Sequence, residues 1–310
     1  MFLGRDSPLN RNCIRQAVIA CTLALAATLL VIVETTSSAY AATTNVRVVS
    51  QNVGKMQGAI DNALAKADST KAHGIALQEV CDHQLAALKA AKSGVWTIAS
   101  VRGGIPLNYC PPGEHVNDVA IWTGGTTGSR AYYGNGDPEG NPNAPITPLG
   151  PSSEGGNMVC VRFNKSTAGS QTVPVHICSV HLNPATGGAQ TAAIRTIVKS
   201  EWFGGTKNHF GVIAGDFNGK PDEGQMDRMY DPAYGAGADG DFTEYNRTQG
   251  FPSRHGTWTA KNKDGTNVRK IDYIFFSTNR VAPRGLNTFS LNAPSGSNHR
   301  LLYSVAAMSY

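Results

Sequence analysis

The chain has 310 residues, of which 41% are hydrophobic and 16% charged, and a formal net charge of +5. At roughly 100–200 residues per domain, this length gives one large domain or two small ones. Because no charge run or low-complexity linker divides the sequence, we expect one domain and exclude a string of linked domains. The mild positive charge suits a polyanionic partner but is too common on protein surfaces to identify one.

The first forty residues have the pattern of a targeting segment. Three basic residues come first: Arg5, Arg11 and Arg15. An uncharged apolar stretch follows at residues 17–33, and an A-x-A cleavage signal stands at residues 39–41. This order predicts a signal peptide over residues 1–41, with no stable membrane insertion after its removal. An uncleaved membrane anchor is the alternative, because about 17 apolar residues are the lower limit for a spanning helix.

The next part of the chain alternates strands with helices. Apolar runs of strand length occur at residues 46–52, 74–80 and 95–101. Between them, apolar residues recur at helical spacing: Ile60, Ala63, Leu64 and Ala67, then Leu85 and Leu88. This order predicts a βαβαβ opening.

The middle of the chain carries strands with no helices between them, at residues 118–122, 157–163 and 173–182. The Gly/Pro-rich stretch at residues 124–156 is too polar for the core, so we expect a long loop there. A helix is predicted at residues 189–203. Four more strands follow, at residues 209–218, 256–259, 270–277 and 301–308. About ten strands with few helices predict two packed sheets with helices outside.

Four cysteines remain once the targeting segment is removed, an even number that suits disulfides in an exported chain. Cys160 and Cys178 lie in two β-rich runs joined by a polar stretch. A hairpin centred near Gly169 would place them opposite each other, within disulfide reach. That pairing leaves Cys81 with Cys110. Free buried thiols are the alternative, which an oxidising compartment disfavours.

Six short polar motifs stand at strand ends: Gln51-Asn52, Gln78-Glu79, His181-Leu182-Asn183, Gly215-Asp216-Phe217-Asn218, Ile271-Asp272-Tyr273 and Ser297-Asn298-His299. Any one of them alone fits a turn or a solvent-exposed strand end. Polar ends of packed strands, however, converge at one end of a sandwich. Their carboxylate and amide oxygens suit magnesium, and two histidines can move protons. Together they predict metal-assisted phosphodiester hydrolysis.

In this order the motifs resemble the endonuclease/exonuclease/phosphatase superfamily, which includes pancreatic-type deoxyribonucleases, abasic-site endonucleases, bacterial sphingomyelinases and inositol-phosphate phosphatases. The resemblance covers residues 46–306. It implies a four-layer α/β/β/α sandwich of two mixed β-sheets with outer helices. It also implies that residues 42–310 are a single catalytic domain that uses Mg²⁺ or Mn²⁺.

The resemblance implies metal-binding roles for several motif residues. Glu79 is expected to be the principal metal ligand, with Asn52 beside it. Asp216 and Asn218 match the residues that hold the phosphate, the metal or the attacking water. Asn298 stands where the family usually has Asp. We expect its amide oxygen to face the metal, but the lost charge puts a second metal in doubt.

The resemblance also implies how protons move. His299 matches the histidine that activates water, and Asp272 the carboxylate that holds its tautomer. His181 matches the histidine that stabilises the phosphorane or protonates the leaving oxygen, with Asp118 as its acidic partner. The arginine that contacts phosphate in the family's nucleases has no clear counterpart. The candidates are Arg130, Arg162, Arg254 and Arg269.

The leading functional hypothesis is a secreted, extracellular, monomeric endonuclease that cleaves DNA, with RNA as a further substrate. The alternative is a sphingomyelinase-like or small-molecule phosphatase. A sphingomyelinase would need an apolar loop tip to enter a membrane, and residues 124–156 offer only Tyr132, Tyr133 and Ile146. Trp258 and Tyr273 could stack on a base, although core packing is the commoner role. A binding protein that has lost its chemistry is a third class, supported only by Asn298.

Overall fold

The computed structural model describes residues 44–103, 110–134, 138, 146–149, 156–166, 171–204, 207–235, 237–244, 254–262, 264–265, 268–292 and 296–309, with backbone only at 146 and 282–291. These residues belong to a compact unit, Ala42–Tyr310. The expected signal peptide at residues 1–41 lies outside the described residues. No helix in the described ranges is long and apolar enough to cross a membrane.

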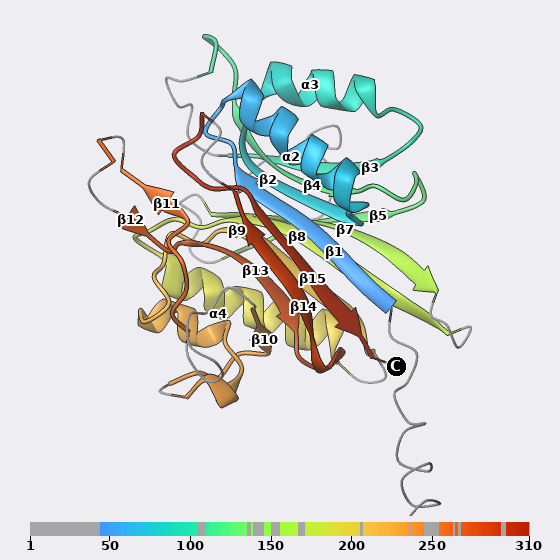
Figure 1. Ribbon diagram of the computed structural model, residues 1–310, viewed down its shortest axis with the longest axis vertical. Helices are drawn as coiled ribbons and strands as arrows, with labels where there is room; N and C mark the ends of the chain where they lie inside the picture. The colour runs from blue at the N-terminus through green and yellow to red at the C-terminus, as the bar shows by residue number, and fades with distance from the viewer. Residues whose placement is uncertain are drawn as a thin grey trace, which may run out of the picture. The chain divides into compact units, whose positions relative to one another are not determined.

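In the described part of the chain, the first sheet has six strands. Their spatial order is β14 (Val281–Leu291), β15 (Leu302–Met308), β1 (Thr44–Asn52), β2 (Gly74–Cys81), β4 (Val116–Trp122) and β3 (Thr97–Arg102). The sheet is mixed, because β1 runs parallel to β2 and antiparallel to β15. The C-terminal end of the chain therefore pairs with its first described strand (Figure 1).

The second sheet has seven strands among the residues that the structure describes. Their spatial order is β10 (Phe242–Thr243), β13 (Asp272–Ser277), β9 (Phe210–Asp216), β8 (Thr172–His181), β7 (Asn157–Ser166), β5 (Ser129–Gly134) and β6 (Ile146–Thr147). It is also mixed, because β8 is parallel to β9 and antiparallel to β7. A separate two-stranded hairpin consists of β11 (Ala260–Lys261) and β12 (Val268–Arg269).

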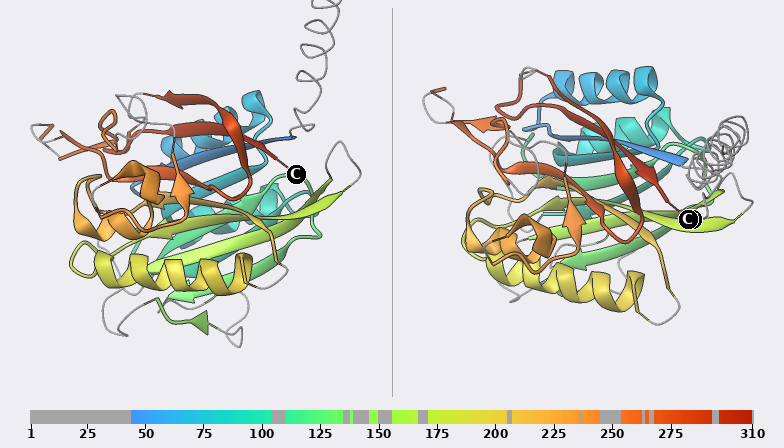
Figure 2. Two further views of the ribbon diagram at one scale, coloured as in Figure 1. Left: turned by 90° about the horizontal axis from the view of Figure 1, so that it is seen from below. Right: turned by 60° about the horizontal axis from the view of Figure 1, so that its bottom comes forward.

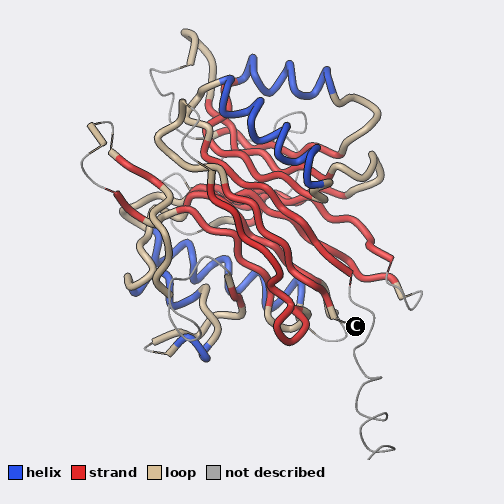
Figure 3. Tube along the Cα trace, viewed as in Figure 1, coloured by secondary structure: helices blue, strands red, loops and turns tan. Residues whose placement is uncertain are grey.

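The two sheets pack face to face with helices on both outer faces, which confirms the four-layer α/β/β/α sandwich (Figure 3). Helices α2 (Gln57–Thr70) and α3 (Asp82–Ala91) cover the first sheet. The second is covered by α4 (Gly187–Ile197), which continues as the π-helix η1 (Val198–Trp202) (Figure 2). Two short 3₁₀ helices follow: η2 (Gly224–Arg228) and η3 (Pro232–Tyr234).

The core between the sheets is built from side chains that alternate along the strands. Val46 and Val48 of β1 belong to the same core cluster as Val175 and Ile177 of β8, and all four are fully buried. Their neighbours point to the helices on the outer faces, as the two-residue period of a strand requires. Burial of both faces explains why these strands are nearly continuous apolar runs.

Some predicted boundaries were wrong. The stretch at residues 124–156 contains β5, which pairs with β7 and buries Tyr132 and Tyr133. This strand escapes a pattern search because it is short and begins with exposed Ser129 and Arg130. The expected strand at 256–259 has no regular secondary structure and leads into β11. Irregular β14 was not predicted, and its pairing with β15 is interrupted by two register shifts.

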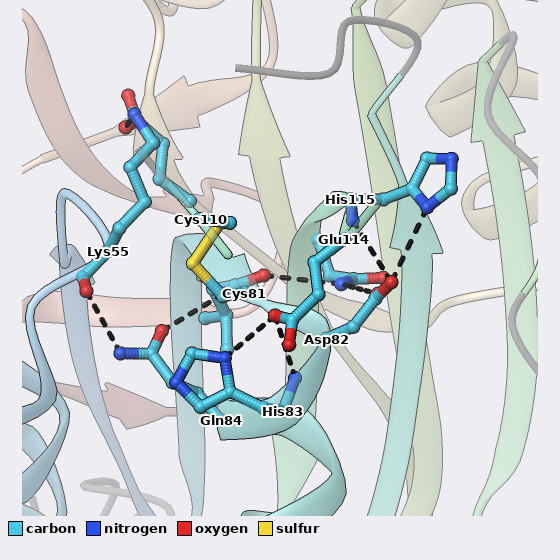
Figure 4. The surroundings of a disulfide bond; sticks show 11 residues. Lys55, Cys81, Asp82, His83, Gln84, Cys110, Glu114 and His115 are labelled. Atoms are coloured by element: carbon cyan, nitrogen blue, oxygen red, sulfur yellow. Dashed lines mark hydrogen bonds and ion pairs between the residues drawn. A yellow bond between two sulfur atoms is a disulfide. The ribbon is translucent and has the colours of Figure 1, made fainter. Parts of the chain in front are cut away.

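Both expected disulfides are present. Cys160 and Cys178 are paired in register on β7 and β8, with their Cα atoms 4.0 Å apart. The second disulfide joins Cys81 to Cys110, with Cα atoms 5.7 Å apart. Cys81 is the last residue of β2 and caps α3 (Figure 4). Two disulfides are compatible with an extracellular protein.

Candidate active site

Strand register brings the polar motifs together at one end of the sandwich. Asp216, the last residue of β9, pairs with His181 at the end of β8 and with Asp272 at the start of β13. On the facing sheet, Asn52 at the end of β1 pairs with Gln78 of β2. Gln78 donates to Ser179 Oγ at 2.8 Å and thereby joins the two sheets. The site is thus a consequence of which strands are neighbours.

The backbone is strained where the site residues leave their strands. Glu79 has φ +61° and sits at a bulge in the pairing of β2 with β4. Asn218 and Lys55 also have positive φ, at +50° and +66°. Such conformations are uncommon for residues with a side chain and cost of order 1–3 kcal/mol each. They place the Glu79 side chain out of the regular strand alternation.

A glycine is required beside Asp216. Gly215 has φ +145°, and a Cβ there would lie 2.0 Å from the carbonyl oxygen of Val180 on the neighbouring strand. Any side chain would therefore push β8 and β9 apart just where His181 and Asp216 face each other.

One asparagine holds the two carboxylates together. Asn52 Nδ2 donates to Glu79 Oε1 and to Asp216 Oδ2, both at 3.1 Å, while its Oδ1 accepts from the Gly54 amide at 3.0 Å. The amide nitrogen of Asn52, rather than its oxygen, therefore faces the carboxylates. Asp216 Oδ1 also accepts from the Asn218 amide at 2.8 Å.

The two carboxyl groups have opposite pKa shifts. Although burial opposes it, the charges of His181 and Lys55 hold the pKa of Glu79 below its ordinary value. Burial and the negative charge of Asp272 raise the pKa of Asp216.

His299 forms a dyad with Asp272. Its Nδ1 lies 2.9 and 3.0 Å from the two Asp272 oxygens, so Nε2 is directed at Asp216 Oδ2, 3.9 Å away. Burial alone would lower the pKa of His299, but the charge and hydrogen bond of Asp272, with Asp216 and Glu79, raise it to about 9. The segment that carries His299 is hydrogen-bonded to β1, because Ser297 Oγ donates to the Asn52 carbonyl at 2.7 Å.

His181 forms the second pair, with Asp118. The Nδ1 atom is 3.4 Å from Asp118 Oδ1, and Nε2 is 3.9 Å from the same Asp216 oxygen that His299 faces. Against the effect of burial, the hydrogen bond and charge of Asp118, with Asp216 and Glu79, raise the pKa of His181 to about 10. Asp118 lies inside β4 and is held by Asn157 Nδ2 at 3.3 Å.

Two other expected site residues, Asn218 and Asn298, donate from their side-chain amides to backbone carbonyls. Half-buried Asn218 donates from Nδ2 to the Leu182 carbonyl at 2.8 Å. Asn298 is exposed, and its Nδ2 donates to the Lys261 carbonyl in β11 at 3.1 Å. Among the described contacts, Asn298 has none with Glu79 or Asp216.

Two of the four candidate phosphate-binding arginines are engaged elsewhere. Arg254 is ion-paired with Asp227 and donates to the Gly235 carbonyl. Arg130 donates to the Ile98 carbonyl, and Arg162 is exposed on β7. Arg269, in β12, has a buried Nε with no hydrogen-bond partner among the described residues.

Lys55 is a site residue that the motifs did not indicate. Its ammonium group is ion-paired with Glu79, and its backbone amide donates to the Glu79 carbonyl at 3.0 Å. Gln84, in the first turn of α3, donates to the Lys55 carbonyl at 2.9 Å (Figure 4). A lysine directly after the Asn52-Val53-Gly54 turn was the only available signal.

Thr259 is the second residue that was missed. Its buried hydroxyl oxygen accepts from the amides of Ile271 and Asp272, at 3.0 and 2.9 Å. It therefore fixes the start of β13, where the partner of His299 lies.

The donor set fits a hard divalent cation. Glu79 and Asp216 offer carboxylate oxygens that share one amide donor, and ligand atoms of Asp216, Asp272 and His299 lie within 4.8 Å of one another. Oxygen donors of this kind suit Mg²⁺ or Mn²⁺.

A second cluster, Cys81, His83 and Glu114, does not offer a comparable set. The Cys81 sulfur is in a disulfide, and the His83 ring is directed at Glu114, 2.7 Å away (Figure 4). One histidine and one carboxylate at the surface are too few ligands for a closed site.

Comparisons with known proteins agree with this geometry. The family described as the endonuclease/exonuclease/phosphatase family matches residues 43–299. No curated protein matches the sequence.

Several solved structures share the fold. The human Nocturnin catalytic domain with bound sulfate has a TM-score of 0.57 at 11% identity, covering 86% of this chain and 95% of that one. A protein of the same family from Bacteroides vulgatus has a TM-score of 0.56 at 12% identity, covering 86% and 100%. D. rerio TDP2 complexed with a single-strand DNA product has 0.52 at 13% identity, covering 84% and 98%. Identities this low show the fold alone.

Proposed function

Because the chain belongs to the endonuclease/exonuclease/phosphatase family, whose members hydrolyse phosphate esters, we propose that it is a secreted, metal-dependent nuclease. The observation that carries the proposal is the pair of carboxylate-bound histidines, each with Nε2 3.9 Å from the same Asp216 oxygen. A phosphodiester needs one proton acceptor and one proton donor on opposite sides of phosphorus. This arrangement supplies the two histidines next to one carboxylate, that of Asp216.

We assign the metal to Glu79 and Asp216, with Asn52 as the residue that holds the two carboxylates in place. Mg²⁺ or Mn²⁺ bound there would neutralise phosphate charge and activate a water molecule. Asn218 is assigned to the phosphate or the attacking water. Asn298 is left out of the ligand set because its amide donates to the Lys261 carbonyl.

His299 is the proposed general base and His181 the proposed general acid. Asp272 accepts from Nδ1 of His299, which leaves Nε2 to take a proton from the attacking water. His181, whose pKa Asp118 helps to raise, gives a proton to the leaving oxygen as the ester bond breaks. A cation held by Glu79 and Asp216 would offset two of the charges that raise the pKa of His299, although not that of Asp272, and would so favour the neutral ring that a base requires.

Nucleic acid is the proposed substrate, and the extracellular space the proposed location. The fold is shared with a TDP2 structure that contains a single-strand DNA product, and the net charge is +5. The disulfides and the signal-like residues 1–41 support secretion. We propose that residues 42–310 act as one catalytic domain and as a monomer.

The test is an activity screen on protein lacking residues 1–41, with and without EDTA. Plasmid DNA, RNA, sphingomyelin and a phosphomonoester are compared, together with Glu79→Gln and His299→Gln variants. We expect cleavage of nucleic acid that requires metal and falls at least ~10²-fold in either variant. His115→Gln, which changes a histidine whose side chain is 44% exposed, is the control. Full activity in EDTA, or in both site variants, would contradict the mechanism. Cleavage of sphingomyelin alone would select the lipid alternative.

A further inference from the structure

The hairpin β11–β12 forms one wall of the site. Ala260 in β11 is bridged to His299, and the Lys261 amide donates to the Asn298 carbonyl. Thr259 contacts Asp272 on the other side. The hairpin projects from the end of the sandwich where β1 ends and β13 begins (Figures 1 and 2). A substrate bound at His299 would therefore lie beside this hairpin.

The hairpin and its neighbours carry positive charge without compensation. Lys261, Arg269 and Arg300 form no ion pair among the described residues. In addition, Nε of Arg269 and Nε of Arg300 are buried without a hydrogen-bond acceptor there. The one acidic residue in the described part of the hairpin is Asp264, near its turn. A buried guanidinium N–H without an acceptor is costly, and phosphate oxygens are the acceptors that arginine matches best.

An aromatic ring lies among these charges. The guanidinium carbon of Arg300 is 3.5 Å from the centre of the Trp258 ring, so the two groups are stacked. Trp258 is half-buried and remains partly open to solvent, which differs from the core packing expected for it. Tyr273 is a core residue, 1% exposed. Trp258 is two residues before Ala260, a distance of about 7 Å at the rise of a strand.

We propose that Trp258, Arg300, Arg269 and Lys261 form a subsite for an unpaired nucleotide next to the scissile phosphodiester. The inference rests on the proposed nuclease function and specifies its substrate as a strand with an unstacked base. An aromatic ring beside cations holds single strands through base stacking and phosphate contacts. A choline headgroup would suit the ring, but the three uncompensated cations would repel it.

The first test is binding of a fluorescein-labelled oligothymidine by fluorescence anisotropy, in a His181→Gln background so that the strand stays intact. Trp258→Ala should weaken binding about 5-fold to 100-fold, and Trp258→Phe should restore most of it. Arg300→Gln and Arg269→Gln should each reduce the slope of log affinity against log salt by about 0.7. A purely structural role would not change that slope.

The chain offers a matched control pair. Lys92 Nζ lies 4.2 Å from the Trp96 ring centre, at the far end of α3 from Glu79. Trp96→Ala and Lys92→Gln should leave oligonucleotide affinity unchanged. If the hairpin variants bind like wild type, or if wild type binds a blunt duplex as tightly as a single strand, the subsite is wrong.

A second test separates the subsite from the proposed function. The kcat/KM for an oligonucleotide should fall at least about fivefold more in Trp258→Ala than the kcat/KM for bis(p-nitrophenyl) phosphate, which has no base to stack. If wild type cleaves no nucleic acid, the proposed function is refuted. If wild type cleaves nucleic acid but Trp258→Ala loses the same factor in kcat/KM on both substrates, only the subsite is refuted. If the hairpin variants lose binding to sphingomyelin vesicles but keep their affinity for the oligonucleotide, the hairpin binds a lipid headgroup and the inference is overturned.

Discussion

Replacing Asp272 by Asn should change how the stability of the metal-free protein depends on pH. The negative charge of Asp272 makes the largest contribution to raising the pKa of His299 from its ordinary 6.5 to about 9. Asn keeps the shape and can still accept from Nδ1, but it removes the negative charge. The variant therefore tests the electrostatic part of the dyad without removing its hydrogen bond.

The sign follows from the raised pKa. Folded protein keeps the His299 proton up to about pH 9, whereas unfolded protein loses it near 6.5. The stabilisation is therefore complete below pH 6.5 and disappears as the pH rises through about 9. At about 1.4 kcal/mol per pKa unit, the His299 contribution is of order 3 kcal/mol. Asp216 and Glu79 remain in the variant, so the pH-dependent loss should shrink by about 1–3 kcal/mol.

The assay is urea unfolding in EDTA at several pH values between about 6 and 9.5, with the free energy of unfolding taken from the linear dependence on urea. Wild type should lose more stability across this range than Asp272→Asn. Asp61→Asn, which removes an exposed carboxylate on α2, is the control for charge alone and should behave like wild type. Identical pH dependence in wild type and Asp272→Asn would refute the electrostatic account of the dyad.

Two further predictions concern the metal. Lys55→Met removes the ammonium group that is paired with Glu79. Calorimetric titration of the metal-free protein should then show Mn²⁺ binding tighter by on the order of tenfold, since one competing cation is gone; unchanged affinity would contradict this. Asn298→Asp should lower the half-saturating metal concentration by less than about tenfold, an effect that about 0.5 M KCl abolishes because the charge acts at a distance. An effect that persists in salt would make residue 298 a direct ligand.

The sequence contained enough information to predict the layers and the location of the site. Strands that are buried on both faces are continuous apolar runs, and their polar ends are easy to recognise. The disulfide between Cys160 and Cys178 could be predicted for a similar reason. A short connection between two adjacent runs permits few registers, and one of them places the two cysteines opposite each other.

The parts that could not be predicted depend on contacts between distant segments. The positive φ of Glu79 has no local signal, because the bulge arises from pairing with β4. Asn157 reaches Asp118 only because β7 packs near β4. The orientation of Asn298 is determined by Lys261 of the short hairpin, whose strands are only two residues long and leave no periodicity to detect.

The division between strands and hairpin also separates chemistry from specificity. His181, Asp216 and Asp272 are fixed by the register of three adjacent strands, which a change in a loop does not alter. Trp258 and Arg300, by contrast, lie outside both large sheets. They are the sequence neighbours of Thr259 and His299, and His299 is bridged to Ala260 of the hairpin. Substitutions in the hairpin can therefore change which ester is bound while the proton-transfer groups stay in place. Function in such a fold has to be inferred from the site and its rim rather than from the layers.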